Sequence, residues 1–203
     1  WMGQFSPEFA LGAAYATKMW MGAFSDYRGL FAQAGDFDVP SSFTLGAAYR
    51  PTEAWLLALD FQRIFYSGVR SVGNPSALIM NCAMGDRNAC LGGSNGAGFG
   101  WRDINVWKFG VQYRLNDQWT LRGGYNYTQN PVQPQDVTFN LIAPGVVQNQ
   151  WTLGAGWKLD AVSEITGMLS QIERIQENGR VRERATRGAI YWIAGLMAAL
   201  TLI

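Results

Sequence analysis

Apolar and polar residues alternate along several short stretches of the 203-residue chain. Each stretch has an aromatic residue, apolar or small residues at every second position after it, and another aromatic at the sixth step. The stretches are residues 9–15, 43–49, 107–113, 119–125 and 151–157. A period of two residues is typical of a β-strand whose two faces differ. The pattern therefore predicts a series of two-faced strands.

The two faces of each predicted strand differ in chemistry. In residues 107–115 one face carries Trp107, Phe109, Val111, Tyr113 and Leu115, and the other carries Lys108, Gly110, Gln112 and Arg114. The aromatic residues are separated by about 20 Å of strand, which is close to the height of the lipid-facing band of an outer-membrane barrel. We therefore expect an all-β fold, an antiparallel transmembrane β-barrel. A soluble β-sandwich with its apolar face turned inward is the alternative.

The predicted strands are joined by two kinds of connection. Residues 51–53 and 116–118 are short turns, whereas residues 67–100 and 129–148 are long and carry Gly, Pro and Asn. Short turns on the periplasmic side and long loops outside are typical of outer-membrane barrels. Within the second long loop, residues 136–142 are a candidate for a brief strand.

Composition narrows the functional classes. Sixteen basic and fifteen acidic residues leave a net charge of +1, so the chain lacks the basic character of a nucleic-acid binder. It contains no His, which excludes a Ser-His-Asp triad, a Cys-His pair and a His metal cluster. We expect no enzymatic activity, no metal, no cofactor and no nucleic-acid partner.

Two pairs of residues could carry chemistry of their own. Cys82 and Cys90 lie in a Gly-rich polar stretch and are candidates for a disulfide, which would imply an oxidising compartment; two free thiols are the alternative. Asp36 and Asp38, in the run GDFD, could be paired acid–base carboxylates. Capping aspartates in a loop turn are the favoured interpretation.

Longer stretches carry a resemblance to a known family. They are residues 24–51, 55–69, 95–132 and 151–167, with a Gly-x-Gly-Trp-x-Asp run that precedes paired strands. In order and spacing these motifs resemble the FadL/TodX type of long-chain fatty acid and aromatic-hydrocarbon transporters of the Gram-negative outer membrane. The resemblance implies a fourteen-stranded barrel with an N-terminal hatch, of which residues 1–167 would supply about seven or eight strands.

The resemblance also implies a function, namely passive uptake of hydrophobic small molecules across the outer membrane. The substrate would enter from outside, bind in the barrel interior and leave sideways into the bilayer. The expected partners are this substrate, membrane lipid and lipopolysaccharide, with a monomeric barrel at full length. A general diffusion porin and a soluble, secreted carbohydrate-binding β-sandwich are the alternative functions.

Strand alternation selects the side chains that would face the interior of such a barrel. They are Asp60, Gln62, Lys108, Arg114, Arg122 and Lys158. Lys108 and Arg122 lie on neighbouring predicted strands and could share one anion, such as a carboxylate head group. The alternative is that these charges pair with one another across strands.

Both ends of the chain depart from the strand pattern. The chain begins at Trp1 with no initiator Met and no signal peptide, so we interpret it as a fragment or a processed product. Apolar residues then follow a helical period at Ile165, Met168, Leu169, Ile172 and Ile175. We expect residues 168–203 to be a helical tail foreign to the family, produced by a shifted reading frame or a fusion, or serving as a membrane anchor.

Overall fold

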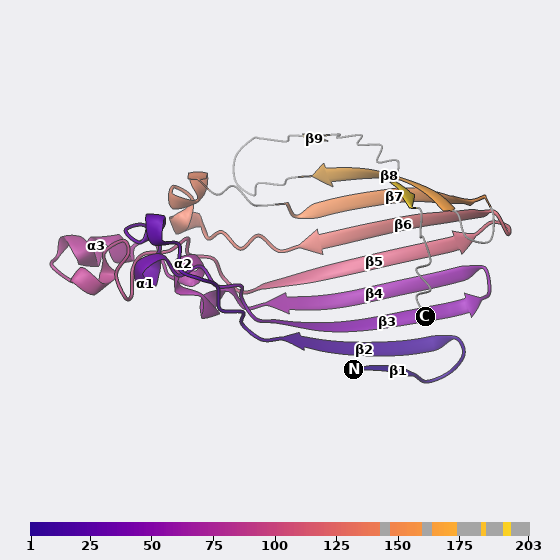
Figure 1. Cartoon of the computed structure of the whole chain (residues 1–203), viewed down its shortest axis with the longest axis horizontal. Helices are drawn as coiled ribbons and strands as arrows, with labels where there is room; N and C mark the ends of the chain where they lie inside the picture. The colour runs from indigo at the N-terminus through magenta and orange to yellow at the C-terminus, as the bar shows by residue number, and fades with distance from the viewer. Residues whose placement is uncertain (143–146, 160–163, 174–183, 186–192, 196–203) are drawn as a thin grey trace, which may run out of the picture.

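The computed structural model describes residues 1–142, 147–159, 164–173, 184–185 and 193–195. Its dominant feature is a single ten-stranded antiparallel sheet in which β1 to β8 lie side by side in chain order, while β9 and β10 both pair with β8 (Figure 1). The strands are β1 (Met2–Gln4), β2 (Phe9–Ala16), β3 (Ser42–Thr52), β4 (Trp55–Ile64), β5 (Ile104–Arg114), β6 (Trp119–Thr128), β7 (Asn149–Lys158), β8 (Glu164–Glu173), β9 (Arg184–Ala185) and β10 (Ile193–Gly195).

The helical elements are all short and lie in the long connections. They are the α-helices α1 (Ala32–Gly35), α2 (Arg70–Gly73) and α3 (Leu78–Ala83), and the 3-10 turns η1 (Ser25–Tyr27), η2 (Tyr66–Gly68), η3 (Arg87–Ala89), η4 (Pro134–Asp136) and η5 (Phe139–Ile142). Among the described residues, no helix combines the length and the apolar character needed to cross a membrane.

The connections alternate as the sequence predicts. In Figure 1 the helical segments gather beyond one end of the sheet, and tight turns close the other end. We call these the long-loop end and the short-turn end. A disulfide joins Cys82 to Cys90, whose Cα atoms are 4.7 Å apart, and it ties α3 to η3 at the long-loop end.

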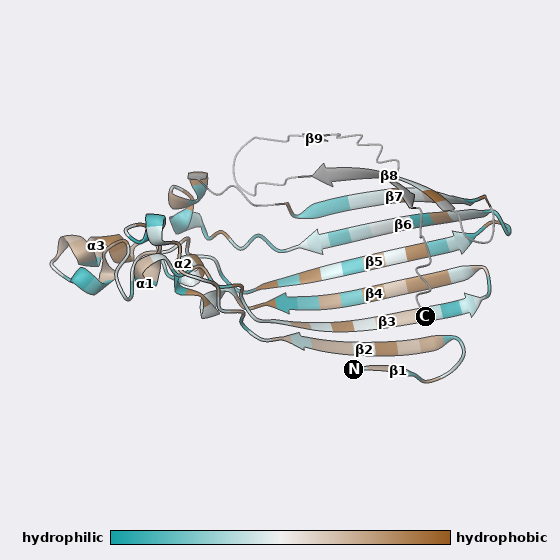
Figure 2. Cartoon of the chain, viewed as in Figure 1, coloured by the Kyte–Doolittle hydropathy of each residue, from teal (hydrophilic) through white to brown (hydrophobic). Residues whose placement is uncertain are grey.

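The strand register places residues of like character opposite one another. Ala58 of β4 lies between Ala48 of β3 and Gly110 of β5. One residue further along, Leu59 lies between Ala47 and Phe109. Because neighbouring residues of a strand point to opposite faces, this register keeps one face of the sheet apolar and the other mixed. Figure 2 shows the resulting alternation of brown with white or teal along the strands.

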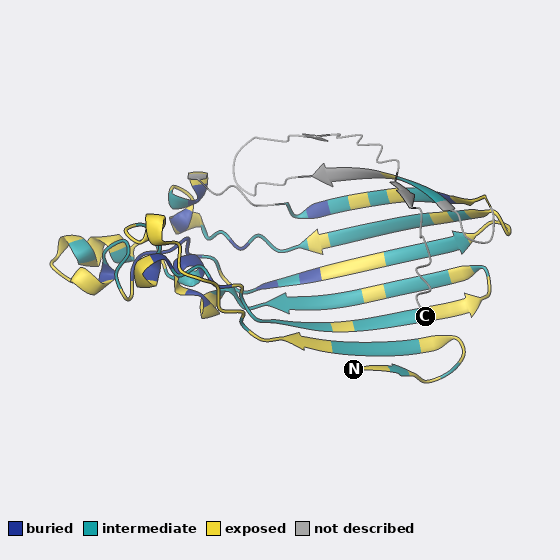
Figure 3. Ribbon diagram, viewed as in Figure 1, coloured by how far each residue is buried: buried dark blue, intermediate teal, exposed yellow. Residues whose placement is uncertain are grey.

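Burial is concentrated at the long-loop end, outside the sheet's centre (Figure 3). The buried apolar residues are Ala32, Val69, Val72, Ala89, Ala97, Phe99, Ile104 and Val106. In contrast, the apolar face of the sheet is exposed: Phe109 is 47% exposed and Leu153 is 67% exposed. The described strands form one layer with no second sheet packed on it, so the β-sandwich alternative is wrong.

Two sequence-based expectations need correction. The helical period around Ile165–Ile172 does not produce a helix, because residues 164–173 form β8 and pair with β7 along the strand's whole length. Pairing with the edge of β7 along ten register positions satisfies the backbone groups that face that edge, and this overrides the local helical period. Ile175 and most of the remaining tail lie outside the described residues. The foreign origin of residues 168–203 therefore stays a prediction. Residues 136–142 form 3-10 turns in place of the brief strand.

Candidate functional site

The apolar face of the sheet carries two belts of aromatic residues. At the long-loop end, the rings of Phe61 and Trp107 are 4.7 Å apart and those of Tyr125 and Trp151 are 4.2 Å apart. At the short-turn end the corresponding pairs are Trp55–Tyr113, at 4.5 Å, and Trp119–Trp157, at 5.7 Å. Cross-strand pairing of aromatics stabilises each belt, and Leu, Val and Phe side chains fill the band between them. This arrangement is that of a lipid-facing barrel wall.

The opposite face is the candidate binding surface, and its centre is a band of small residues. In register across β3 to β7 this band consists of Ala48, Ala58, Gly110, Gly124 and Thr152. Polar side chains lie in rows on both sides of the band. The upper row, toward the long-loop end, contains Asp60, Lys108 and Asn126, and the lower row, toward the short-turn end, contains Gln112 and Arg122. Beside Gly124 the space is taken by the Thr152 hydroxyl, which would lie 2.6 Å from an added Cβ atom, whereas beside Gly110 only the Ala58 methyl group comes within 4 Å.

The upper row contains Asp60 and Lys108, which are register partners. The Lys108 Nζ donates a hydrogen bond to Gln62 Oε1 at 3.0 Å, and among the described residues no ion pair joins Lys108 to Asp60. The Asp60 carboxylate lies over Gly46, where a Cβ atom would come within 2.6 Å of Oδ1. Asn126, the partner of Lys108 on β6, has a buried Oδ1 with no hydrogen-bond partner. The upper row is therefore polar and incompletely paired.

The lower row contains Arg122, whose Nε donates to Gln112 Oε1 at 3.1 Å. Gln112 is the register partner of Arg122, whereas Lys108 pairs with Asn126. Lys108 and Arg122 are thus offset by four residues of strand, or about 13 Å. The register therefore sets the backbones of these two residues apart along the sheet, and the sequence-based idea that they share one anion stays a prediction.

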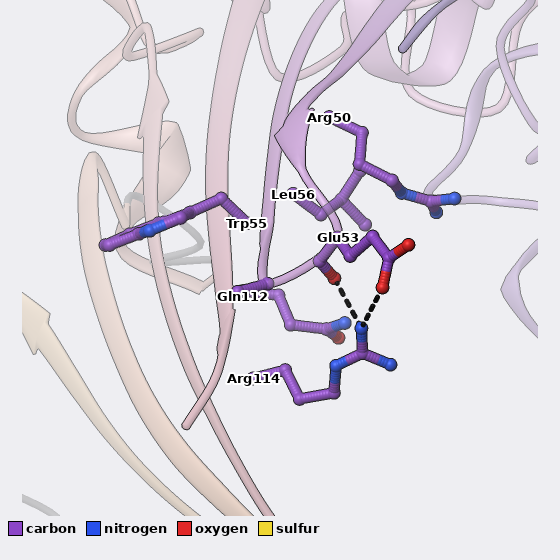
Figure 4. Close-up of a pocket in the computed structure, with 7 residues that line it drawn as sticks. Arg50, Glu53, Trp55, Leu56, Gln112 and Arg114 are labelled. Atoms are coloured by element: carbon purple, nitrogen blue, oxygen red, sulfur yellow. Dashed lines mark hydrogen bonds and ion pairs between the residues drawn. The ribbon is translucent and has the colours of Figure 1, made fainter. Parts of the chain in front are cut away.

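A cavity of about 390 Å³ lies at the short-turn end of this face (Figure 4). We call it the hairpin cavity, because the β3–β4 hairpin supplies Arg50, Glu53, Ala54, Trp55 and Leu56, and β5 adds Gln112 and Arg114. Arg114 Nη2 donates to the Glu53 carbonyl at 3.0 Å and lies 3.6 Å from Glu53 Oε2. The Trp55 ring points away from these charged groups, consistent with its place in the outer aromatic belt (Figure 4).

Arg50 is a residue of this cavity that the sequence analysis missed. Its side chain has no hydrogen-bond or ion-pair partner among the residues that the structure describes. The signal was present, because the alternation of β3 continues from Ala48 to Arg50. Lys158 lines a second cavity, of about 290 Å³, together with Arg114, Asp117, Gln118, Thr120 and Gly156. Basic side chains therefore gather at the short-turn end.

The aspartate pair of the GDFD run ties the first long connection together. Asp38 is 3% exposed; its Oδ2 lies 2.7 Å from Lys18 Nζ and its Oδ1 accepts from the Met21 N–H at 2.8 Å. Burial would raise the pKa of the Asp38 carboxyl, but the hydrogen bonds from Lys18, Met21 and Asp36 lower it below its ordinary value. Burial, reinforced by the hydrogen bond and charge of Asp38, raises the pKa of Asp36. These contacts hold the loop at the isolated bridge between Met19 and Val39.

A second polar cluster ties the two other long connections to each other. Asp136 is fully buried, and its Oδ1 accepts hydrogen bonds from both the N–H and the hydroxyl of Ser76. Asn140 accepts from the Trp101 indole at 2.6 Å and donates to the Phe99 carbonyl at 2.7 Å. The described residues contain no group of three or more Asp, Glu, Cys or His side chains that could hold a metal ion.

Comparison with solved structures identifies similar folds. The P. putida toluene transporter TodX superposes with a TM-score of 0.54 at 20% identity, covering 84% of this chain and 40% of that one. A Pseudomonas aeruginosa FadL homologue superposes with a TM-score of 0.57 at 16% identity, covering 86% of this chain and 43% of that one. The chain thus spans about two fifths of the length of these structures. At these identities the likeness shows the fold alone.

Comparison of the sequence with curated proteins finds no match. A family model does match, over residues 4–184, which is most of the chain; it describes the outer membrane protein transport proteins OMPP1/FadL/TodX. The match agrees with the two aromatic belts and with the short turns opposite long loops. The chain therefore belongs to the OMPP1/FadL/TodX family of transport proteins and forms part of a β-barrel of the Gram-negative outer membrane.

Proposed function

We propose that the protein carrying this chain is a passive channel for hydrophobic small molecules, either long-chain fatty acids or aromatic hydrocarbons. The observation that carries this proposal is the contrast between the two faces of the sheet. One face is built to contact lipid, and the other combines a central band of small residues with a few charged side chains. Such an interior leaves room for an oily molecule while providing few groups to retain it.

In this proposal transport needs no catalytic group. The substrate binds along the inner face and is released into the bilayer. Asp60, Gln62, Lys108, Arg114 and Arg122 line its path. Lipopolysaccharide surrounds the long-loop end of a barrel that is monomeric at full length. Among the similar proteins, TodX is a toluene transporter, which supports the hydrocarbon branch of the proposal.

The test is uptake by cells that lack their own hydrophobic channels and express the full-length protein. Labelled oleate and labelled toluene should enter faster than in cells without the protein. Swelling of proteoliposomes in sugars is the control, and it should stay at the level of empty liposomes. Rapid swelling with no gain in oleate or toluene entry would instead identify a general diffusion porin.

The role of the upper row can be tested within the same assay. Lys108→Gln removes the cation that binds Gln62 and should change oleate uptake while toluene uptake stays constant, because only oleate carries a charge. Arg87→Gln is the matched control, since Arg87 lies in η3 at the long-loop end. An equal effect of Lys108→Gln on oleate and toluene uptake would contradict the proposal that Lys108 contacts the charged substrate.

A further inference from the structure

We propose that the hairpin cavity is a binding subsite for the carboxylate of an amphiphilic monoanion. The inference rests on the proposed function and adds to it a second contact point, at the short-turn end of the inner face. It assigns the central role to Arg50 and Arg114, which line the same cavity of about 390 Å³ (Figure 4). A cavity of this size falls within the range of small-molecule sites.

The charges of the hairpin cavity are unbalanced by one. Arg50 and Arg114 supply two guanidinium groups, and Glu53 supplies the one carboxylate among the lining residues. Arg114 is held at the hairpin by the Glu53 carbonyl, while the Glu53 side chain is 98% exposed. An incoming carboxylate can therefore take its place beside Arg114 and also reach Arg50. Guanidinium groups bind planar carboxylates through paired hydrogen bonds, and one excess cation matches a monoanion.

The surroundings of the cavity supply a place for a hydrocarbon chain. Arg50 and Leu56 also line an adjoining cavity of about 180 Å³, whose walls include the apolar residues Phe9, Ala10 and Ala48 and also Glu8, whose carboxylate accepts a hydrogen bond from the Ser6 hydroxyl. Ala10 and Ala48 are register partners and extend the central band of small residues to β2. A ligand can thus place its head between the two arginines and its chain over Leu56 and the alanines. Gln112 lines the head-group cavity, where its Oε1 is already bound by Arg122.

The test compares decanoate with decanol, which share a chain and differ in head-group charge. Binding is measured by calorimetry on the full-length protein purified in a nonionic detergent. We expect wild-type protein to bind decanoate at least about 10-fold more tightly than decanol, since hydrogen bonds to a charged group are worth that much. The double substitution Arg50→Gln with Arg114→Gln should abolish the difference, and raised salt should reduce it. Arg87→Gln, at the opposite end of the sheet, should preserve it.

Other outcomes would overturn the subsite. Equal affinity of wild-type protein for decanoate and decanol contradicts it, as does unchanged decanoate affinity in the double variant. Absence of decanoate binding to both the wild-type protein and the double variant also contradicts it, whatever the melting temperature of the variant. Toluene uptake separates this test from that of the proposed function. If the protein takes up toluene but binds decanoate and decanol equally, the subsite is contradicted and the proposed function is not.

Discussion

Gly100 shows how closely single residues determine the packing of the long loops. Its φ is +66°, and a Cβ added there would overlap the buried Asp136 carboxyl. Gly85 also has a positive φ, of +104°, yet nothing lies within 4 Å of its added Cβ. The two glycines therefore separate the cost of backbone strain from the cost of a steric clash.

We predict that Gly100→Ala weakens the contact between the two long loops much more than Gly85→Ala does. The left-handed backbone costs an alanine about 1–2 kcal/mol at residue 100, and the clash with Asp136 adds about 1–3 kcal/mol there, whereas strain at residue 85 meets no neighbouring atom of the contact. Hydrogen exchange of the Trp101 indole, which bonds Asn140, measures the local opening free energy. Equal losses in the two variants would show that Asp136 does not fix this loop.

The Asp36–Asp38 pair makes a prediction about pH. The pKa of Asp38 is lowered on folding, so its stabilising effect is complete above the ordinary carboxyl value near 3.8 and is lost as pH falls through the lowered value. The pKa of Asp36 is raised, so its effect has the opposite sign: it stabilises at low pH and is lost as pH rises through the raised value. The two carboxyl groups should therefore stabilise the first long connection most at a pH near the ordinary carboxyl pKa.

At pH 7 the two asparagine substitutions should therefore act in opposite directions. Asp38→Asn removes the charge that pairs with Lys18 and should cost about 1–3 kcal/mol of local stability. Asp36→Asn removes a carboxylate that repels Asp38 and should stabilise the loop slightly. Exchange rates of the Met21 amide, which binds Asp38, report both effects. Similar changes in the two variants would contradict the opposed pKa directions.

At the scale of elements, β8 is where sequence and structure diverge. The alternation of Trp, Leu, Gly and Tyr identified β2 to β7, and the turn residues identified their connections. The apolar residues after Gly167 fit a helical period, and only the free edge of β7 converts them to a strand. Arg50 escaped notice because it follows the last apolar position of its strand. The packing of the long loops depends on contacts between distant segments, which no local pattern encodes.

A pair of cysteine substitutions tests the β7–β8 register directly. Ala155 and Gly167 are register partners, so Ala155→Cys with Gly167→Cys should form a disulfide under mild oxidation. Leu153→Cys with Gly167→Cys is the matched control on the same face, offset by two residues, and should stay reduced. The native Cys82–Cys90 disulfide lies at the other end of the molecule. Non-reducing mass spectrometry distinguishes these outcomes, and efficient cross-linking of the control pair would refute the register.

At the scale of the whole molecule, the sheet inverts the usual arrangement of a water-soluble protein. Its large apolar side chains lie on an exposed face between two aromatic belts, and its buried residues gather in the loops beyond one end. Exposed apolar surface of this extent is costly in water and favourable in hydrocarbon. The same contrast between faces accounts for membrane residence and for the inner face of small residues and few charges along which the proposed channel would carry its substrate.

The contrast between the two faces of β4 can be measured by comparing the loss of stability that an arginine causes on each face. Leu59 lies on the apolar face, between Ala47 and Phe109, so Leu59→Arg puts a charge into the hydrocarbon band and should cost about 2–4 kcal/mol. Gln62, on the same strand but the inner face, should accept arginine with little loss of stability. Urea unfolding of the full-length protein in lipid vesicles gives the free energies, and heat-modifiable gel migration reports assembly. Because both variants add the same side chain to one strand, a larger loss from Gln62→Arg would mean that the faces have been assigned the wrong way round.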